Sequence, residues 1–309
     1  MSGHLCRLTL RASPSPRTLG ASPLPRTLCP TLSSAEPTHA PVSTGLAALR
    51  QPESNRGLAT DVPTRRRRRL EGLLPAAVTT PAVEVRRALE SVRRALGPLD
   101  KYRAAMAIYS ADQDAFVSLL QNHATEILPY VYTPTVGDAC LNWGALVPTP
   151  PGLYLAPPAR CRDLVANWPH EDIRVAVVTN GERVLGLGDL GAHGMPISIG
   201  KGLLYTACGI HPSHILPVVV DVGTDNEALM RDPLYIGLRQ PRLRGAPFTA
   251  FMDEVVDALR ERYGASLIVH FEDFGASTAW VTADTRSLRQ SRAAVPCNAT
   301  CCDVIRDVL

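Results

Sequence analysis

Residues 175–208 read VAVVTNGERVLGLGDLGAHGMPISIGKGLLYTAC, and this stretch decides the fold. Its first five residues are apolar and mostly β-branched, which predicts a short buried strand at 175–179. Asn180-Gly181 marks a turn after that strand. Six glycines between Gly181 and Gly200 then permit positive φ angles and a close backbone approach to a ligand. With few bulky side chains and a basic residue near each end, the segment is typical of the wall of an anion site.

Residues 186–191 also satisfy the spacing G-x-G-x-x-G of dinucleotide-binding loops. Two features argue against that interpretation. Gly194 and Pro196 interrupt the helix that should follow. No acidic residue that could bind a ribose hydroxyl occurs between Asp189 and Asp221. We therefore predict a tight structural turn in this segment.

Other periodic segments surround the central stretch. The apolar runs 215–222 and 267–271 predict buried strands, and residues 251–263 predict an amphipathic helix before the second run. Residues 84–107 have helical periodicity broken at Gly97-Pro98, and their arginines are expected on a solvated face. Residues 114–128 predict another helix, which Pro129 should stop.

Composition sets limits on the class of protein. The chain has 309 residues, of which 45% are hydrophobic, enough for the core of one or two domains. A net charge of +3 gives no sign of nucleic-acid binding, and no apolar run approaches the ~18 residues of a membrane span. The eight cysteines lack the paired spacing of a secreted scaffold, which favours reduced thiols inside an organelle.

The N-terminal segment has the composition of a targeting sequence. Residues 1–35 contain arginines among Ser, Pro, Thr and Leu, with no acidic residue and no continuous apolar core. This pattern is typical of an organellar transit peptide rather than a secretory signal, and we favour the mitochondrial matrix, with the plastid stroma as the alternative. Residues up to Thr64 are rich in Pro and Ser and are expected to lack fixed structure, so 1–64 is interpreted as leader and linker. The run Arg65–Arg69 is interpreted as a solvated linker or processing site rather than a polyanion patch.

Several motifs along the chain share one resemblance. The central stretch, Tyr132-Thr-Pro-Thr-Val-Gly137 upstream, and Asp221-Val-Gly-Thr-Asp-Asn226, Asp232-Pro-Leu-Tyr-Ile-Gly-Leu238 and Phe271-Glu-Asp-Phe274 downstream resemble the N-terminal domain of malic enzymes. These enzymes decarboxylate malate oxidatively to pyruvate and CO₂ with NAD(P)⁺ and Mg²⁺ or Mn²⁺. The resemblance implies an α/β domain over residues 65–280, with a helical N-terminal region and a mainly parallel sheet flanked by helices. It also implies malate as ligand and a homo-oligomer in which the helical region contacts the partner subunit.

Tyr132 lies just before a loop that Pro134 restricts, and a phenol can act as a general acid only when it is held rigidly. The resemblance places Tyr132 on the family's catalytic tyrosine, which protonates C3 of the enolate left after CO₂ departs. The neighbouring Tyr130 is expected to be a buried, hydrogen-bonded residue.

Two basic residues of the central stretch have a chemistry suited to malate. The guanidinium of Arg183 can bind a carboxylate through two hydrogen bonds, and lysines such as Lys201 shift their pKa readily on burial. The resemblance makes Arg183 the malate-binding arginine and Lys201 the base that takes the hydroxyl proton. We expect Lys201 at the head of a helix over 203–207, on a loop distorted because Pro196 stands where the family has glycine. His193 is expected on the surface or in a loop, without a role.

Glu272 and Asp273 stand side by side at the end of the 267–271 strand. Paired carboxylates there are good ligands for a hard cation, although they can also be a solvated strand end. The resemblance makes them two of the family's three Mg²⁺ or Mn²⁺ ligands.

Besides Pro196, the chain departs from the family in two further places. Residues 145–163 are unusually rich in proline, which puts a strand there in doubt. After Phe274 the family continues to an Asn-Asp-Asp-Ile-Gln-Gly-Thr motif, which carries the third metal ligand, and to the nucleotide-binding domain. Here residues 281–309 read as an aberrant, disordered tail with a short helix near 304–308, and the cysteines at 297, 301 and 302 make a weak metal motif. We expect the chain to be inactive alone; the alternatives are a non-catalytic subunit that pairs with full-length malic enzyme, or an incomplete gene model.

Overall fold

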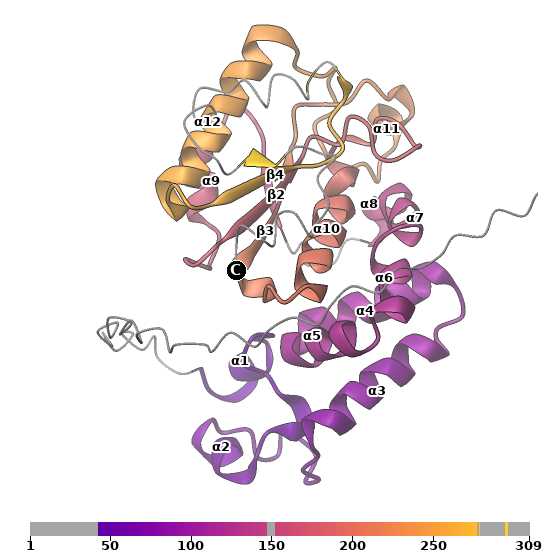
Figure 1. The fold of residues 1–309 in the computed structure, drawn as a ribbon, viewed down its shortest axis with the longest axis vertical. Helices are drawn as coiled ribbons and strands as arrows, with labels where there is room; N and C mark the ends of the chain where they lie inside the picture. Colours follow the sequence, from indigo (N-terminus) through magenta and orange to yellow (C-terminus); the bar gives the residue numbers. More distant parts are fainter. Residues whose placement is uncertain (1–42, 147–151, 277, 279–293, 296–309) are drawn as a thin grey trace, which may run out of the picture. The chain divides into compact units, whose positions relative to one another are not determined.

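The computed structural model describes residues 43–146, 152–276, 278 and 294–295, all within one compact unit. Its centre is a parallel sheet with the strand order β1-β3-β2-β4-β5 (Figure 1). The strands are β1 (Leu153–Leu155), β2 (Val175–Thr179), β3 (Ile215–Val220), β4 (Ile268–Phe271) and β5 (Ala294–Val295). The three strands predicted from apolar runs are confirmed, and so is the parallel α/β class.

One face of the sheet is covered by two helices, α9 (Cys161–Ala166) and α12 (Gly245–Tyr263) (Figure 1). Alternate residues of the strands point into this layer, because side chains along a strand alternate between faces. Val178 of β2 and Val269 of β4 pack there with Met252 of α12 in one buried cluster. This side of the sheet is an apolar core.

The opposite face is covered by α10 (Met195–Ala207), which packs on β2 and β3 and in turn against the helical N-terminal region. That region contains α3 (Pro81–Arg94), α4 (Pro98–Ala111), α5 (Gln113–Asn122), α6 (Ala124–Val131) and α7 (Thr135–Leu141). The predicted break at Gly97-Pro98 separates α3 from α4, and Arg86, Arg87, Arg93 and Arg94 are exposed on α3 as expected. Short elements complete the described chain: α8 (Trp143–Leu146), η2 (Gly191–Gly194), η3 (Pro212–His214) and α11 (Glu227–Arg231).

Two expectations about helix boundaries were wrong. The helix α10 begins at Met195, eight residues before the predicted start, because Pro196 falls in its first turn, where the missing N–H needs no partner. Residues 114–128 form parts of two helices with a break at His123, and Pro129 lies inside α6. This helix continues past the proline and ends with a hydrogen bond from Tyr132 N to the Leu128 carbonyl.

The expectation that residues up to Thr64 lack structure is wrong for residues 43–64. This segment contains α1 (Gly45–Leu49), η1 (Gly57–Ala59) and the start of α2 (Val62–Arg67), which Asp61 caps through Thr64 N. In the arginine run, Arg66, Arg67 and Arg69 are exposed as expected, but the run begins within α2 rather than in a linker and Arg65 is buried. Arg65 is only 4% exposed and donates to the carbonyls of Thr60, Leu58, Pro75 and Ala77.

Several predictions concern residues outside the described part of the chain. The leader at 1–42, the helix at 304–308 and the cysteines at 297, 301 and 302 all lie there. Of the tail expected to be disordered, Ala294 and Val295 are described and pair with β4 as β5. The strand in doubt at 145–163 is present as the three residues of β1. No helix within the described residues is long and apolar enough to cross a membrane.

Replacing Arg65 should destabilise the fold. In Arg65→Met the apolar part of the side chain is kept, but four backbone carbonyls lose their charged donor. We expect the free energy of unfolding in urea to fall by about 3 kcal/mol, given what buried unpaired polar groups cost. Arg67→Met, on the exposed side of α2, is the matched control and should change it by less than about 0.5 kcal/mol. Equal stability of the two variants would contradict this account of Arg65.

Candidate functional site

Three predicted residues from distant parts of the chain meet at one carboxylate. Glu272 follows β4, Lys201 lies in the middle of α10, and Tyr132 ends α6. The Glu272 Oε1 atom accepts from Lys201 Nζ at 3.0 Å and from the Tyr132 hydroxyl at 3.1 Å. The ammonium group also lies 5.5 Å from the centre of the Tyr132 ring. The carboxyl ends of parallel strands are the usual position of ligand sites in open α/β sheets.

The pair formed by Lys201 and Glu272 is nearly closed to solvent, with side chains 11% and 7% exposed. Burial opposes the ionisation of Glu272, but the hydrogen bond with His270 and the charge of Lys201 outweigh it and lower the pKa of Glu272. The carboxylate is therefore held in its charged form. Lys201 is supplied by a regular helix rather than by the distorted loop that we expected.

A fourth residue of this cluster, His270, was missed by the sequence analysis. Its Nε2 atom lies 2.8 Å from Glu272 Oε2, and its side chain is completely buried. The signal was present in the sequence as a single histidine within the apolar run LIVHF, two residues before Glu272 and so on the same face of the strand. Tyr205 of α10 contacts its other ring nitrogen.

Asp273 lies beside this cluster in the left-handed region, at φ 56°. Its Oδ2 atom accepts from Leu185 N at 3.2 Å. Burial, and then the charge of Glu272, raise the pKa of Asp273 to about 6. Adjacent carboxylates that repel each other in a half-closed site fit a divalent cation, which would neutralise both. No group of three or more His, Cys, Asp or Glu side chains suited to a metal occurs among the described residues, so the described part of the chain adds no third ligand of these types to Glu272 and Asp273.

Arg183 is joined to the metal-ligand candidates through its backbone. Its N–H donates to the Asp273 carbonyl at 3.2 Å, while its side chain is exposed. The backbone of Arg183 therefore lies next to Asp273, and its side chain is exposed to solvent. His193, by contrast, is 2% exposed, so the expectation of a surface histidine was wrong, and burial lowers its pKa.

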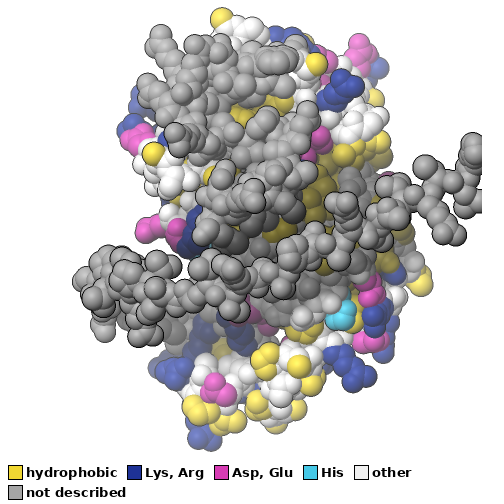
Figure 2. Space-filling model, in the orientation of Figure 1, with side chains coloured by type: hydrophobic (Ala, Val, Ile, Leu, Met, Phe, Trp, Pro, Cys, Tyr) yellow, Lys and Arg dark blue, Asp and Glu magenta, His cyan; other side chains and the backbone are white. Residues whose placement is uncertain are grey.

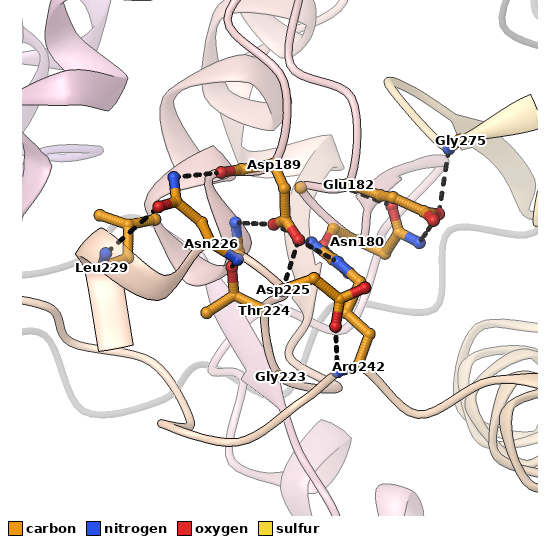
Figure 3. Close-up of polar contacts among 12 residues, drawn as sticks. Asn180, Glu182, Asp189, Gly223, Thr224, Asp225, Asn226, Leu229, Arg242 and Gly275 are labelled. Carbon is orange, nitrogen blue, oxygen red and sulfur yellow. Dashed lines mark hydrogen bonds and ion pairs between the residues drawn. The ribbon is translucent and has the colours of Figure 1, made fainter. Parts of the chain in front are cut away.

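The glycine-rich segment is fastened to its neighbours by a buried ion pair (Figure 3). Arg242 donates from Nε and Nη2 to the two carboxylate oxygens of Asp189, at 2.7 and 2.6 Å, and from Nη1 to the Asn180 carbonyl. Asp189 also accepts from Asp225 N, and its carbonyl accepts from the Asn226 amide. This arrangement supports the prediction of a structural turn at residues 186–191 and connects it to the 221–226 loop. Sequence reasoning did not single out Arg242.

A second connection fastens the segment that follows Asp273. Glu182, the neighbour of Arg183, accepts from Gly275 N and the Thr278 hydroxyl (Figure 3 shows Gly275). Arg244 joins Glu182 to Asp225 with contacts of 2.9 and 2.6 Å. The glycine-rich segment and the segment after Asp273 are therefore both held in place by hydrogen bonds to charged side chains.

Gly200 allows α10 to approach Tyr132. A Cβ atom at this position would lie 2.6 Å from Cδ2 of the Tyr132 ring and 2.9 Å from the Val131 carbonyl oxygen. A Cβ atom essentially never lies that close to a non-bonded heavy atom. The residue before Lys201 must be glycine for Lys201 and Tyr132 to share Glu272.

The fold and the site together define an α/β domain whose strand ends carry a lysine, a tyrosine and paired carboxylates. The sequence matches the family described as "Malic enzyme, N-terminal domain" over residues 110–285. The chain belongs to the malic enzyme family, which confirms the resemblance seen in its motifs.

Curated relatives agree with this assignment. The chain is 42% identical over 242 residues to the chloroplastic NADP-dependent malic enzyme of Zea mays, covering 77% of this chain and 38% of that one. It is 43% identical over 242 residues to the NADP-dependent malic enzyme of Phaseolus vulgaris, covering 77% and 41%. The chain thus spans about two fifths of the length of the curated relatives it matches.

Adding one methyl group at position 200 should disturb the site. Although alanine favours a helix over glycine by about 1 kcal/mol, we expect Gly200→Ala to lower the free energy of unfolding by about 1–3 kcal/mol, because Tyr132 must move. The control is Gly202→Ala in the same helix, where a Cβ meets a single side-chain atom, the Cγ2 methyl of Ile215, at 2.9 Å. Urea unfolding of the two variants measures the difference, and a Gly200→Ala protein as stable as the wild type would rule out the close approach.

The two carboxylates should have opposite effects on stability as pH changes. The pKa of Asp273 is raised from 3.8 to about 6, so the folded state loses stability as pH rises through this window. Asp273→Asn should therefore be more stable than the wild type at pH 8, by about 3 kcal/mol, and approach it below about pH 4. Glu272→Gln should be less stable than the wild type at pH 8, because a lowered pKa contributes stability above the ordinary value of 4.5. Thermal unfolding with a chelator present checks both signs, and the same pH dependence in both variants would contradict them.

Proposed function

We propose that this site binds malate and a divalent cation, as the malate-binding part of an enzyme that decarboxylates malate oxidatively to pyruvate and CO₂. The observation that carries the proposal is the convergence of Lys201, Tyr132 and Glu272 within 3.0–3.1 Å at the strand ends. A base, an acid and a carboxylate at that distance have the components for proton transfer at adjacent carbons. Membership of the malic enzyme family supports the assignment.

In this proposal the ammonium of Lys201, which pairs with Glu272, first gives up a proton, and the neutral amine then takes the proton from the hydroxyl on C2 of malate. Tyr132 delivers a proton to C3 of the enolate that remains after CO₂ leaves. Both groups share one carboxylate oxygen, so their atoms lie on the same side of the site and can face neighbouring carbons of one substrate. A phenol has an ordinary pKa near 10, and the fixed geometry compensates for its weak acidity.

Arg183 binds a carboxylate of malate in this scheme. Its guanidinium is exposed, and its backbone is tied to Asp273, so it can reach a substrate placed over the strand ends. Planar guanidinium groups bind carboxylates through two parallel hydrogen bonds. Malate carries two carboxylates, and Arg183 would fix one of them.

Glu272 and Asp273 would hold Mg²⁺ or Mn²⁺. Their oxygens are hard donors, and burial together with the charge of Glu272 raises the pKa of Asp273, so a cation beside it would favour its charged form. A bound cation would polarise the oxygens of the substrate. The nicotinamide cofactor would accept the hydride from C2. The relatives are named NADP-dependent, which favours NADP⁺ over NAD⁺.

Location and partners are part of the same proposal. Relatives in Zea mays, Arabidopsis thaliana and Oryza sativa are named chloroplastic, which favours the plastid stroma over the mitochondrial matrix that we expected from the leader. The N-terminal region exposes apolar side chains beside basic ones (Figure 2, lower part). Leu46, Val62, Leu73, Val78 and Val83 are each more than 40% exposed. This favours pairing with a second copy or with a full-length malic enzyme.

Calorimetric titration of the full chain with Mn²⁺, with and without malate, tests the proposal. We expect malate to tighten Mn²⁺ binding, because both would share the site. Glu272→Ala/Asp273→Ala should abolish the saturable part of the isotherm. Arg183→Met should weaken malate binding about tenfold or more while leaving Mn²⁺ binding alone unchanged, because it removes a charged hydrogen bond pair.

Arg86→Met is the control for the arginine, since Arg86 is exposed on α3 and away from the strand ends. It should bind Mn²⁺ and malate like the wild type. Identical isotherms for the wild type and the double carboxylate variant would refute the metal site. Equal effects of Arg183→Met and Arg86→Met would refute the role of Arg183.

A further inference from the structure

A buried chain of hydrogen bonds extends from Glu272 into the core, away from the proposed malate site. His270 is fully buried and lies with Nε2 2.8 Å from Glu272 Oε2. Its Nδ1 atom lies 2.5 Å from the hydroxyl of Tyr205, which is also fully buried. The two rings meet edge to face, with centroids 5.8 Å apart and an interplanar angle of 76°. Both residues are enclosed by α10 and β4.

The same helix supplies both ends of this arrangement. Lys201 and Tyr205 are four residues apart in α10, so they lie on one face, one turn from each other. Lys201 reaches Oε1 of Glu272, and Tyr205 reaches Oε2 through His270. Residues of α10 therefore contact both oxygens of the Glu272 carboxylate, Lys201 directly and Tyr205 through His270.

The chemistry of the partners fixes the proton on His270. An ionised carboxylate can only accept, so the short contact with Glu272 requires a proton on Nε2. In the neutral ring Nδ1 is then an acceptor, and the Tyr205 hydroxyl can donate to it. In such an arrangement, the hydrogen bond at one ring nitrogen of a histidine determines the protonation of the other and fixes the direction of the ring.

We infer that His270 is a positioning residue for Glu272, with the Nε2 proton held by the carboxylate of Glu272 and Nδ1 in contact with the Tyr205 hydroxyl. By holding Oε2, it turns Oε1 toward Lys201 and Tyr132 and keeps the carboxylate plane fixed. This inference rests on the proposed function, because it concerns the carboxylate that would bind the cation and organise the base and acid. If His270 only filled space in the core, replacing it with a residue of similar size that lacks the donor would leave the carboxylate of Glu272 and its Mn²⁺ affinity unchanged.

The first test needs neither metal nor substrate. In the full chain labelled with ¹⁵N-histidine, two-bond correlations report which ring nitrogen carries the proton. We expect the Nε2–H form for His270, with slow exchange of that proton, assigned by its loss in His270→Gln. In Glu272→Gln the proton should exchange much faster, because its charged acceptor is gone. An Nδ1–H ring, or unchanged exchange in Glu272→Gln, would overturn the inference.

The second test measures Mn²⁺ affinity in matched variants. His270→Phe fills the same space without a donor and should weaken Mn²⁺ binding by about tenfold or more, as loss of an orienting partner usually does. His270→Gln places an amide donor near Nε2 and should stay within about threefold of the wild type. Tyr205→Phe, which removes only the hydroxyl, should fall between them and serves if His270→Phe does not fold. Val269→Ala, in the same strand but facing the opposite core, should lose stability and keep its Mn²⁺ affinity.

The outcomes separate the inference from the proposed function. If the wild type binds no Mn²⁺, the metal site fails, while the tautomer and exchange measurements still decide whether His270 holds Glu272. If the wild type binds Mn²⁺ but His270→Phe and Tyr205→Phe bind it equally well, the positioning role is wrong and the metal site stands. If Val269→Ala loses as much affinity as His270→Phe, the effect is one of stability and the positioning role is refuted.

Discussion

The rest of the site depends on one constraint, a carboxylate that must stay ionised in a nearly closed space. Glu272 is 5% exposed, and burial alone would favour its protonated form. The hydrogen bond with His270 of β4 and the charge of Lys201 of α10 reverse this preference, and the Tyr132 hydroxyl at the end of α6 also donates to the carboxylate. Because an unpaired buried charge is strongly destabilising, the elements can pack stably only in the arrangement that brings these donors together. The position of the helical N-terminal region against the sheet is therefore linked to the charge of one side chain.

The surrounding chain is built to make that arrangement rigid. The absence of a side chain at Gly200 lets α10 approach Tyr132, and the bidentate pair between Arg242 and Asp189 holds the glycine-rich turn. Arg242 has a side chain only 1% exposed, so this pair has stabilising value only with its full set of hydrogen bonds, which include the Asn180 carbonyl. Glycines give the turn its shape, and the ion pair removes the freedom that they would otherwise confer. The backbone of a glycine-rich turn can in this way have as fixed a conformation as a segment with bulky side chains.

Sequence reasoning located the strands, the break at Gly97-Pro98, Glu272 itself and two of the residues that meet it, Tyr132 and Lys201, because these follow from local patterns and from family motifs. It failed where a residue's role depends on its distant neighbours. Pro196 was interpreted as a helix breaker, although position in the first turn decides whether a proline breaks or begins a helix. Arg65 was interpreted as solvated, since nothing in a run of arginines tells which one faces four carbonyls. His270 and Arg242 escaped notice for the same reason, because their partners lie 65 and 53 residues away in sequence.

The two neighbouring carboxylates differ in a way that follows from backbone geometry. Glu272 continues the direction of β4 and points toward α10, where Lys201 and His270 surround it. Asp273 takes a left-handed conformation, and its Oδ2 atom accepts from Leu185 N. Burial and the charge of Glu272 outweigh this hydrogen bond and the charge of Lys201, so the pKa of Asp273 rises while that of Glu272 falls. The two adjacent carboxylates are therefore chemically unequal, because Glu272 favours its charged form and Asp273 would gain more from a cation.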